Sequence, residues 1–142
     1  MTGTIRVACA TDTGELIDGH FGSCRAFLVY QVSPQAVEFV NALSTAAADE
    51  EEDRNKARAA LIDGCQIACF LSIGGPAAAK VVRVGAHPLK VAPNTRVDDM
   101  LAKLQLAIKS PPPWLAKVMG VEPASLAPFR ELVELDEFAE EE

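Results

Sequence analysis

The chain has 142 residues, and 49% of them are hydrophobic, so it is long and apolar enough for one compact domain with a core. Its formal net charge is −7, and the acidic residues concentrate in two clusters, 49–53 and 131–142. This distribution argues against nonspecific nucleic-acid binding, which needs a basic surface. It leaves open a small anionic ligand in a locally basic cleft.

No run of 18 or more apolar residues occurs, so no membrane-spanning helix and no membrane partner are expected. The first ten residues, MTGTIRVACA, lack the basic region and the long apolar stretch of a signal peptide. We therefore expect a cytoplasmic protein whose four cysteines are reduced.

The first half of the chain predicts three strands that follow one another closely. Residues 5–10 alternate in the manner of a strand, and 25–33 and 36–43 are rich in β-forming residues. A short turn joins the second and third strands into a hairpin. The loop between the first and second strands, TDTGELIDGHFGSC (11–24), contains three glycines and three acidic residues.

The second half predicts helices that alternate with short strands. The acidic stretch 46–53 is expected to be a solvated loop, and Gly64 is a natural end for the helix that follows it. The run CQIACFLS has the continuous apolar character of a buried parallel strand. In chain order we expect a helix at 53–63, a strand at 65–72, a helix at 76–85, a strand at 87–92 and a helix that contains 97–108 and ends before Pro111.

The last predicted helix has an apolar face at spacings of four, three and four, formed by Val97, Leu101, Leu104 and Ile108. Thr95 with Asp98 resembles a capping box at its start. Three prolines, 111–113, end the helix, and 114–120 is expected to add a helical turn.

We expect a domain over residues 1–120 and a loosely attached acidic tail over 121–142. In this tail, a spacing of three suggests a short amphipathic helix that contains Leu126, Phe129, Leu132 and Leu135.

This order of elements predicts an α/β fold with a five-stranded mixed sheet of order 3-2-1-4-5, flanked by helices in a ribonuclease-H-like layout. The first three strands are antiparallel, and the later crossovers are right-handed. Strands one and four are then parallel neighbours, with connections that leave in different directions. Ligands favour the carboxyl-end crevice at such a switch point. The loops holding GHFGSC and SIGGP meet there, which locates a candidate site.

His20 is the clearest candidate in the first of these loops. Gly19 and Gly22 allow the backbone to approach a ligand closely, and histidine is the commonest metal ligand. The alternative is an exposed loop histidine without a role. Cys24 offers a second, soft ligand for an iron–sulfur species, although a small buried hydrophobe is an equally ordinary role for cysteine.

Cys65 and Cys69 resemble a metal pair, but their spacing is wrong for a strand. Residues four apart in a strand are separated by about 13 Å, whereas two thiolates on one metal need sulfurs within about 4 Å. Core packing is therefore expected, without a disulfide. No CxxC occurs, so zinc-ribbon and thioredoxin-type sites lose support.

In the second loop, Gly74, Gly75 and Pro76 open a helix whose free N–H groups favour an anion. A tight strand-to-helix turn without a ligand is the alternative. No lysine followed by serine or threonine completes a Walker loop. Positive charge from Lys80, Arg83 and Lys90 is available nearby, although solvated surfaces usually explain such residues.

Enzymatic chemistry finds little support. Nucleases of ribonuclease-H type use paired acids around metal ions, but the first strand has no acid at its centre, and the remaining candidates are Asp12, Asp18 and Asp98. A serine or cysteine hydrolase lacks any GxSxG-like signal. We expect a binding protein, not an enzyme.

Three segments in order, DGHFGSCRAFLVYQV, SIGGPAAAKVVRVGAHPLKV and PPPWLAKVMG, resemble the dinitrogenase iron–molybdenum cofactor biosynthesis family, and within it the NifX/NifY/NafY group. The resemblance covers about residues 4–120 and implies a ribonuclease-H-like fold. The family's members bind the iron–molybdenum cofactor or its iron–sulfur precursor, and some hold cofactor-free dinitrogenase in a receptive state. Some relatives carry a further N-terminal domain; this chain is expected to be the cofactor-binding core, either by itself or as one domain of a longer protein.

The histidine of the family's HFG motif is implicated in cofactor binding, and it corresponds to His20, the expected metal ligand. The resemblance thus implies a carrier that delivers its cluster to apo-dinitrogenase and works with other cofactor biosynthesis proteins. The alternative is a protein–protein module that stabilises apo-dinitrogenase without carrying the cluster. The expected cofactor-binding set is Gly19, His20, Phe21, Gly22, Cys24, Gly74 and Gly75.

Overall fold

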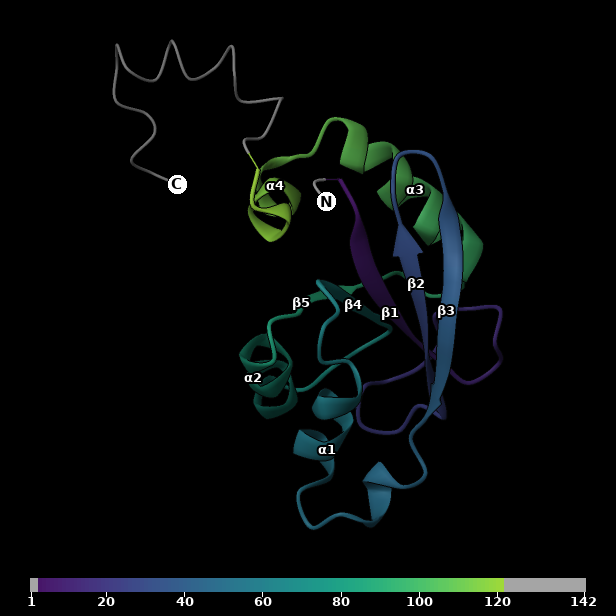
Figure 1. Ribbon diagram of the computed structural model, residues 1–142. Helices are drawn as coiled ribbons and strands as arrows, with labels where there is room; N and C mark the ends of the chain where they lie inside the picture. Colours follow the sequence, from purple (N-terminus) through teal and green to yellow (C-terminus); the bar gives the residue numbers. More distant parts are fainter. Residues whose placement is uncertain (1–2, 122–142) are drawn as a thin grey trace.

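The computed structural model describes residues 3–121 of the chain. Its five strands form one mixed sheet in the order β3-β2-β1-β4-β5 (Figure 1). The two hairpin connections make β1, β2 and β3 antiparallel, whereas β4 and β5 run parallel to β1. The predicted order is confirmed. The strands are β1 Ile5–Thr11, β2 Ala26–Val32, β3 Val37–Ser44, β4 Ile67–Phe70 and β5 His87–Lys90.

Helices cover both faces of the sheet, because the side chains of β1 alternate between two separate cores. Ala8 and Ala10 pack on the side of α1 and α2, while Val7 and Cys9 pack on the side of α3 and α4. Figure 1 shows α1 and α2 together on one side and α3 behind the other. The helical elements are η1 Ala48–Glu50, α1 Arg54–Leu61, α2 Gly75–Arg83, α3 Val97–Lys109 and α4 Pro113–Met119.

The apolar face predicted for α3 is confirmed, since its four residues are all buried against the sheet. The predicted capping box is wrong. The Thr95 hydroxyl donates to the backbone oxygen of Ala92 at 2.6 Å, and the N-cap falls one residue later, on Arg96, without a side-chain cap. The hydroxyl closes the preceding turn and is not available to the helix.

Two further expectations need correction. The apolar run 65–72 contains a strand of only four residues, β4, although Cys65 is buried as well. The stretch 46–53 is not simply a solvated loop, because it contains η1 and buries Ala48. The expected tail beyond Val121 lies outside the described residues.

Within residues 3–121, no helix combines the length and the apolar character that a membrane crossing requires.

Candidate functional site

The loop between β1 and β2 returns to the carboxyl ends of β1 and β4 and is held there by backbone hydrogen bonds. Gly19 N–H donates to the backbone oxygen of Ala10 at 3.1 Å, and Leu71 N–H donates to that of Gly19 at 2.9 Å. Phe21 N–H then donates to the backbone oxygen of Ser72 at 3.0 Å. The two loops predicted to meet at the switch point therefore do so.

His20 projects from this junction and is exposed. It forms an isolated parallel bridge with Ser72, and its Nδ1 is hydrogen-bonded to the Ser72 hydroxyl. The backbone oxygen of His20 accepts N–H groups from Ser23 and Cys24, at 3.1 and 2.9 Å, which closes a tight turn after it. Both the backbone and the ring of His20 are thus positioned by the protein.

Phe21 anchors the loop to the hydrophobic core. Its side chain is fully buried and packs edge-on against Phe70, with ring centroids 5.4 Å apart, and against Phe27 at 5.7 Å. Phe21 thus points into the core, while His20 next to it is exposed. Phe21 therefore supports the site through packing. Its side chain is a buried hydrocarbon ring and has no atom that could ligate a metal.

The glycines of the two loops have different physical roles. A Cβ on Gly19 would lie 2.5 Å from the Cβ of Cys24 and 2.9 Å from backbone atoms of Ala10 and Thr11. Gly19 is therefore required by packing against the end of β1, not by the approach of a ligand. By contrast, a Cβ on Gly74 or Gly75 would meet nothing within 4 Å, and both residues are exposed.

Gly74 and Gly75 begin α2 next to the turn that holds Ser72. Gly74 is the N-cap and provides no side-chain cap, so the first N–H groups of the helix are not satisfied by a capping side chain. Gly22 has only the Asn55 side chain near its Cβ position, at 3.8 Å. Gly22, Gly74 and Gly75 therefore remain open to a ligand in a way that Gly19 does not.

Cys24 lies in the core, not at the surface of the loop. Its side chain is fully buried beside Phe21 and Phe27. Burial raises the pKa of its thiol to about 11, although the nearby Arg58 guanidinium, 3.5 Å from the sulfur, partly opposes this rise. At neutral pH this sulfur is a buried thiol, which is a poor ligand for an incoming cluster. The core-packing alternative for Cys24 fits this environment better than the ligand role.

Two arginines of α1 hold the loop from the side, and the sequence interpretation did not include them. Arg58 is 1% exposed and donates from Nη1 to the backbone oxygens of Phe21, at 2.8 Å, and Cys24, at 3.1 Å. Arg54 donates from Nη2 to the backbone oxygen of Gly22 at 2.7 Å. Both pair with Asp49 of η1, through N–O distances of 2.8 Å for Arg58 and 3.3 Å for Arg54.

The ion pair between Arg58 and Asp49 changes the pKa of both groups. Burial disfavours the charged form of Arg58, but its hydrogen bond to Asp49 and its proximity to Cys24 raise its pKa overall. The hydrogen bond from Arg58 is also the main cause of the lowered pKa of Asp49. The sequence shows that Arg54 and Arg58 are four residues apart and so share one face of the predicted helix, but it does not show their contacts with the loop.

The other cysteines take no part in the site. Cys65 and Cys69 are buried and unbridged, as predicted. Cys9, which the sequence interpretation did not consider, is the register partner of Cys69 on β1. Among residues 3–121, no group of three or more His, Cys, Asp or Glu side chains is arranged to hold a metal ion.

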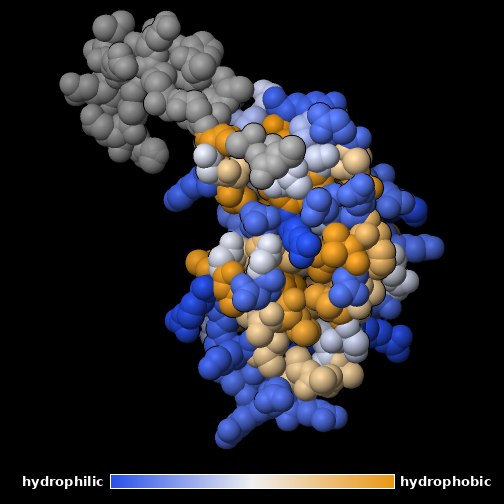
Figure 2. All heavy atoms as spheres, viewed as in Figure 1, coloured by the Kyte–Doolittle hydropathy of each residue, from blue (hydrophilic) through white to orange (hydrophobic). Residues whose placement is uncertain are grey.

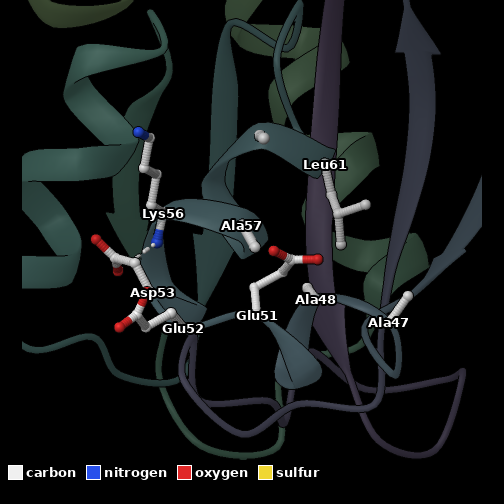
Figure 3. A pocket seen from close by; sticks show the side chains of 9 residues that line it. Ala47, Ala48, Glu51, Glu52, Asp53, Lys56, Ala57 and Leu61 are labelled. Carbon is white, nitrogen blue, oxygen red and sulfur yellow. Dashed lines mark hydrogen bonds between the residues drawn. The ribbon is translucent and has the colours of Figure 1, made fainter.

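A pocket of about 530 Å³ lies between η1 and α1 (Figure 3). Figure 3 shows the carboxylate of Glu51 between the small side chains of Ala57 and Ala48, with Glu52 and Asp53 together to the left of them. In Figure 2 this lower end of the molecule is largely hydrophilic, with a paler, weakly hydrophobic patch. No residue of 19–24 lines this pocket, so it is separate from the His20 site.

Comparison with known proteins gives a consistent result. Residues 3–107 match the family described as "Dinitrogenase iron-molybdenum cofactor". Protein NifY of Azotobacter vinelandii is 46% identical over an alignment of 121 residues that covers 84% of this chain and 50% of NifY. Protein NifX of Sinorhizobium fredii is 36% identical over an alignment of 128 residues that covers 84% of this chain and 80% of NifX. The chain thus spans about half the length of that NifY but most of that NifX.

The fold also has solved relatives. The apo form of the orange protein from Desulfovibrio gigas superposes with a TM-score of 0.53 and 17% identity, covering 75% of this chain and 90% of that one. This likeness concerns the fold alone. The match over residues 3–107 and the NifX and NifY relatives lead to one conclusion: the chain belongs to the dinitrogenase iron-molybdenum cofactor family, which is involved in nitrogen fixation and in the maturation of the nitrogenase cofactor.

Proposed function

We propose that this protein binds the iron–molybdenum cofactor, or its iron–sulfur precursor, as cargo and delivers it to apo-dinitrogenase, with His20 as the metal ligand. The observation that carries the proposal is the position of His20. It is exposed at the switch point of the sheet, while the backbone on both sides of it is fixed by hydrogen bonds to β1 and to the turn after β4.

The hydrogen bond to Ser72 prepares the imidazole for coordination. The Ser72 hydroxyl can accept the proton of Nδ1, which is the tautomer that leaves the lone pair of Nε2 free for a metal. Hydrogen bonding at one ring nitrogen is the usual means by which proteins orient a ligating histidine and raise its basicity. Ser72 is therefore proposed as the orienting partner of His20.

The start of α2 supplies a second point of contact. The resemblance implies a large anionic cluster that bears an organic acid, and unsatisfied N–H groups at a helix N-terminus attract carboxylates. Gly74 and Gly75 have open space around them and adjoin the turn that contains Ser72. We propose that the carboxylates of the cargo face this end of α2, with Gly22 leaving room on the other loop.

A sparse ligand set suits a carrier. Delivery requires that the cluster be released, and one imidazole with backbone N–H groups is easier to exchange than several thiolates. The burial of all four cysteines agrees with this mode of binding. The second candidate, a module that stabilises apo-dinitrogenase without carrying a cluster, predicts no binding of the isolated cluster.

The test is an anaerobic titration with isolated iron–molybdenum cofactor and, separately, with the iron–sulfur precursor. His20→Ala should lower the affinity at least roughly tenfold, because even partners of a metal ligand contribute that much. The fold should be unchanged, since the ring is exposed. His87→Ala is the matched control, because His87 is the other histidine of the chain and lies at the amino end of β5.

Equal affinities of His20→Ala and wild type would exclude His20 as the ligand. Absence of cluster binding by the wild-type protein, combined with binding to apo-dinitrogenase, would favour the protein–protein module.

A further inference from the structure

The buried Arg58 connects α1 to the loop that carries His20. Its guanidinium has five N–H donors in a planar fork. Nε and Nη2 donate to the two carboxylate oxygens of Asp49 at 2.8 and 2.9 Å, in a bidentate pair. Nη1, on the other prong, donates to the backbone oxygens of Phe21 and Cys24. One side chain therefore joins η1, α1 and the loop.

The two carbonyls that Arg58 binds belong to the turn that His20 begins. Phe21 directly follows His20, and the N–H of Cys24 donates to the backbone oxygen of His20 itself. Thr45 adds a hydroxyl that donates to the backbone oxygen of Cys24 at 2.7 Å. The peptide groups on the carboxyl side of His20 thus have their orientation set by partners from 45–58, far away in the sequence.

Arginine is an unusual residue in a position as buried as that of Arg58. A buried cation costs free energy unless its donors are paired, and an apolar side chain of similar size often stabilises a core better. An apolar residue, however, would leave the backbone oxygen of Phe21 without this donor. Within the described residues, every buried side-chain nitrogen and oxygen has a partner, so the network is complete.

Arg54 adds a second, more exposed contact of the same kind. It lies one turn earlier on α1, donates to the backbone oxygen of Gly22 and also pairs with Asp49. Its side chain is half exposed. Three carbonyls of the turn, those of Phe21, Gly22 and Cys24, are therefore fixed by two arginines that share one carboxylate.

We propose that Arg58, oriented by Asp49, is a positioning residue for cluster binding: it fixes the turn 20–24 and thereby the direction in which His20 is presented. This inference rests on the proposed role of His20 as the ligand. Arg58 itself does not touch the cargo, because its guanidinium is enclosed by Phe21, Cys24 and Asp49.

The first variant is Arg58→Met, which keeps most of the side-chain volume and removes all the donors. Hydrogen–deuterium exchange should become at least tenfold faster at the N–H groups of Ser23 and Cys24, which donate to His20, and stay unchanged within β1 and β4. The affinity for isolated iron–molybdenum cofactor should fall about tenfold. Arg6→Met is the control for the lost charge, since Arg6 is exposed near the amino end of β1.

Two further variants keep the test valid if Arg58→Met does not fold. Asp49→Asn retains Arg58 but removes the charge of its partner, and because the Asp49 side chain is 37% exposed, the core is not directly disturbed. Arg58→Lys retains the charge but cannot bind Asp49 and two carbonyls at once. Both should show faster exchange at Ser23 and Cys24 together with weaker cluster binding, with Arg58→Lys between wild type and Arg58→Met.

The outcomes separate this inference from the proposed function. Faster exchange at Ser23 and Cys24 without a change in cluster affinity would overturn the positioning role while leaving His20 as the ligand. Unchanged exchange in folded Arg58→Met would also overturn it. Loss of affinity in the arginine variants with normal affinity in His20→Ala would instead overturn the ligand role of His20.

Discussion

The four cysteines show how burial, more than spacing, decides the chemistry of a residue. Cys9 and Cys69 are register partners in the centre of the sheet, and the contact between their thiols, together with burial, raises the pKa of Cys9 well above its usual value. Burial likewise raises the pKa of Cys65 to about 11. Cys9, Cys24 and Cys65 therefore stay as neutral thiols at physiological pH. All four cysteines are buried and unbridged and act as small apolar side chains.

Replacing both Cys65 and Cys69 by alanine should consequently affect stability and not cargo binding. Lost packing should lower the free energy of unfolding by up to about 3 kcal/mol, because each substitution leaves a small cavity in a different core. Chemical denaturation measures this change. Anaerobic titration of the same variant should give nearly the wild-type affinity for the cluster. A large loss of affinity in the folded double variant would indicate that one of these thiols is a ligand.

At the residue scale, local pattern predicted the site only in part. The exposure of His20 and the burial of Phe21 follow from their polarity within a loop between two strands, and both are found. The burial of Cys24 and the close packing of Gly19 depend on how the loop folds back onto β1. The role of Arg58 depends on contacts across 34 and 37 residues, which no local pattern contains.

At the scale of elements, the hydrophobic pattern predicted which segments are buried. It was less accurate about which residues pair with a neighbouring strand. The run 65–72 is apolar, but Cys65 belongs to the turn after α1, where its N–H donates to the backbone oxygen of Ile62. Ladder pairing begins only at Ile67. The further helical turn expected after the prolines is confirmed as α4, and its left-handed end at Gly120, with φ of 74°, suits a residue without a side chain.

The start of α2 allows a test in which stability and binding should change in opposite directions. Gly75 is helical, without a positive φ, and has open space at its Cβ position. Gly75→Ala should therefore stabilise the fold by about 0.5 kcal/mol, by restricting the unfolded chain. If cargo carboxylates approach this backbone closely, the added methyl group should weaken binding about two- to fivefold, the size of one anion–helix contact.

Thermal unfolding and anaerobic cluster titration of the same preparation measure the two effects. Ala79→Ser is the matched control, because Ala79 is exposed one turn further along α2. An increase in stability without any change in affinity would show that the cargo does not contact this end of the helix. His20 would then be the remaining contact to examine.

At the scale of the whole molecule, the sheet order follows from connection lengths and crossover handedness, which is why it was predictable. The ribonuclease-H-like label for this order stays a prediction.

Charge is divided unequally along the chain. Residues 122–142 contain eight of the 20 acidic residues and one of the 13 basic ones, so the 12 acids and 12 bases before them balance. The domain that holds the His20 site is thus neutral overall, although the whole chain is strongly acidic.

This division gives a final prediction, on truncation. The sequence predicts a domain boundary at Gly120, and this boundary stays a prediction. In the structure, the N–H of Val121 donates to the backbone oxygen of Ala116 and completes the cap of α4, so we choose Val121 as the end of a truncated chain. A chain that ends at Val121 should fold, since residues 3–121 already form a hydrophobic core on each face of the sheet. Its thermal midpoint should lie within a few degrees of that of the full chain, which corresponds to about 1 kcal/mol or less.

The truncated chain should also bind isolated iron–molybdenum cofactor at least as tightly as the full chain. Removal of residues 122–142 takes away a net charge of −7, which repels an anionic cargo over the Debye length of about 10 Å at 0.1 M salt. The difference in affinity between the two chains should therefore be largest at low salt. Failure of the truncated chain to fold would show that the segment is part of the structural core, and weaker binding at every salt concentration would show that it contributes to the site.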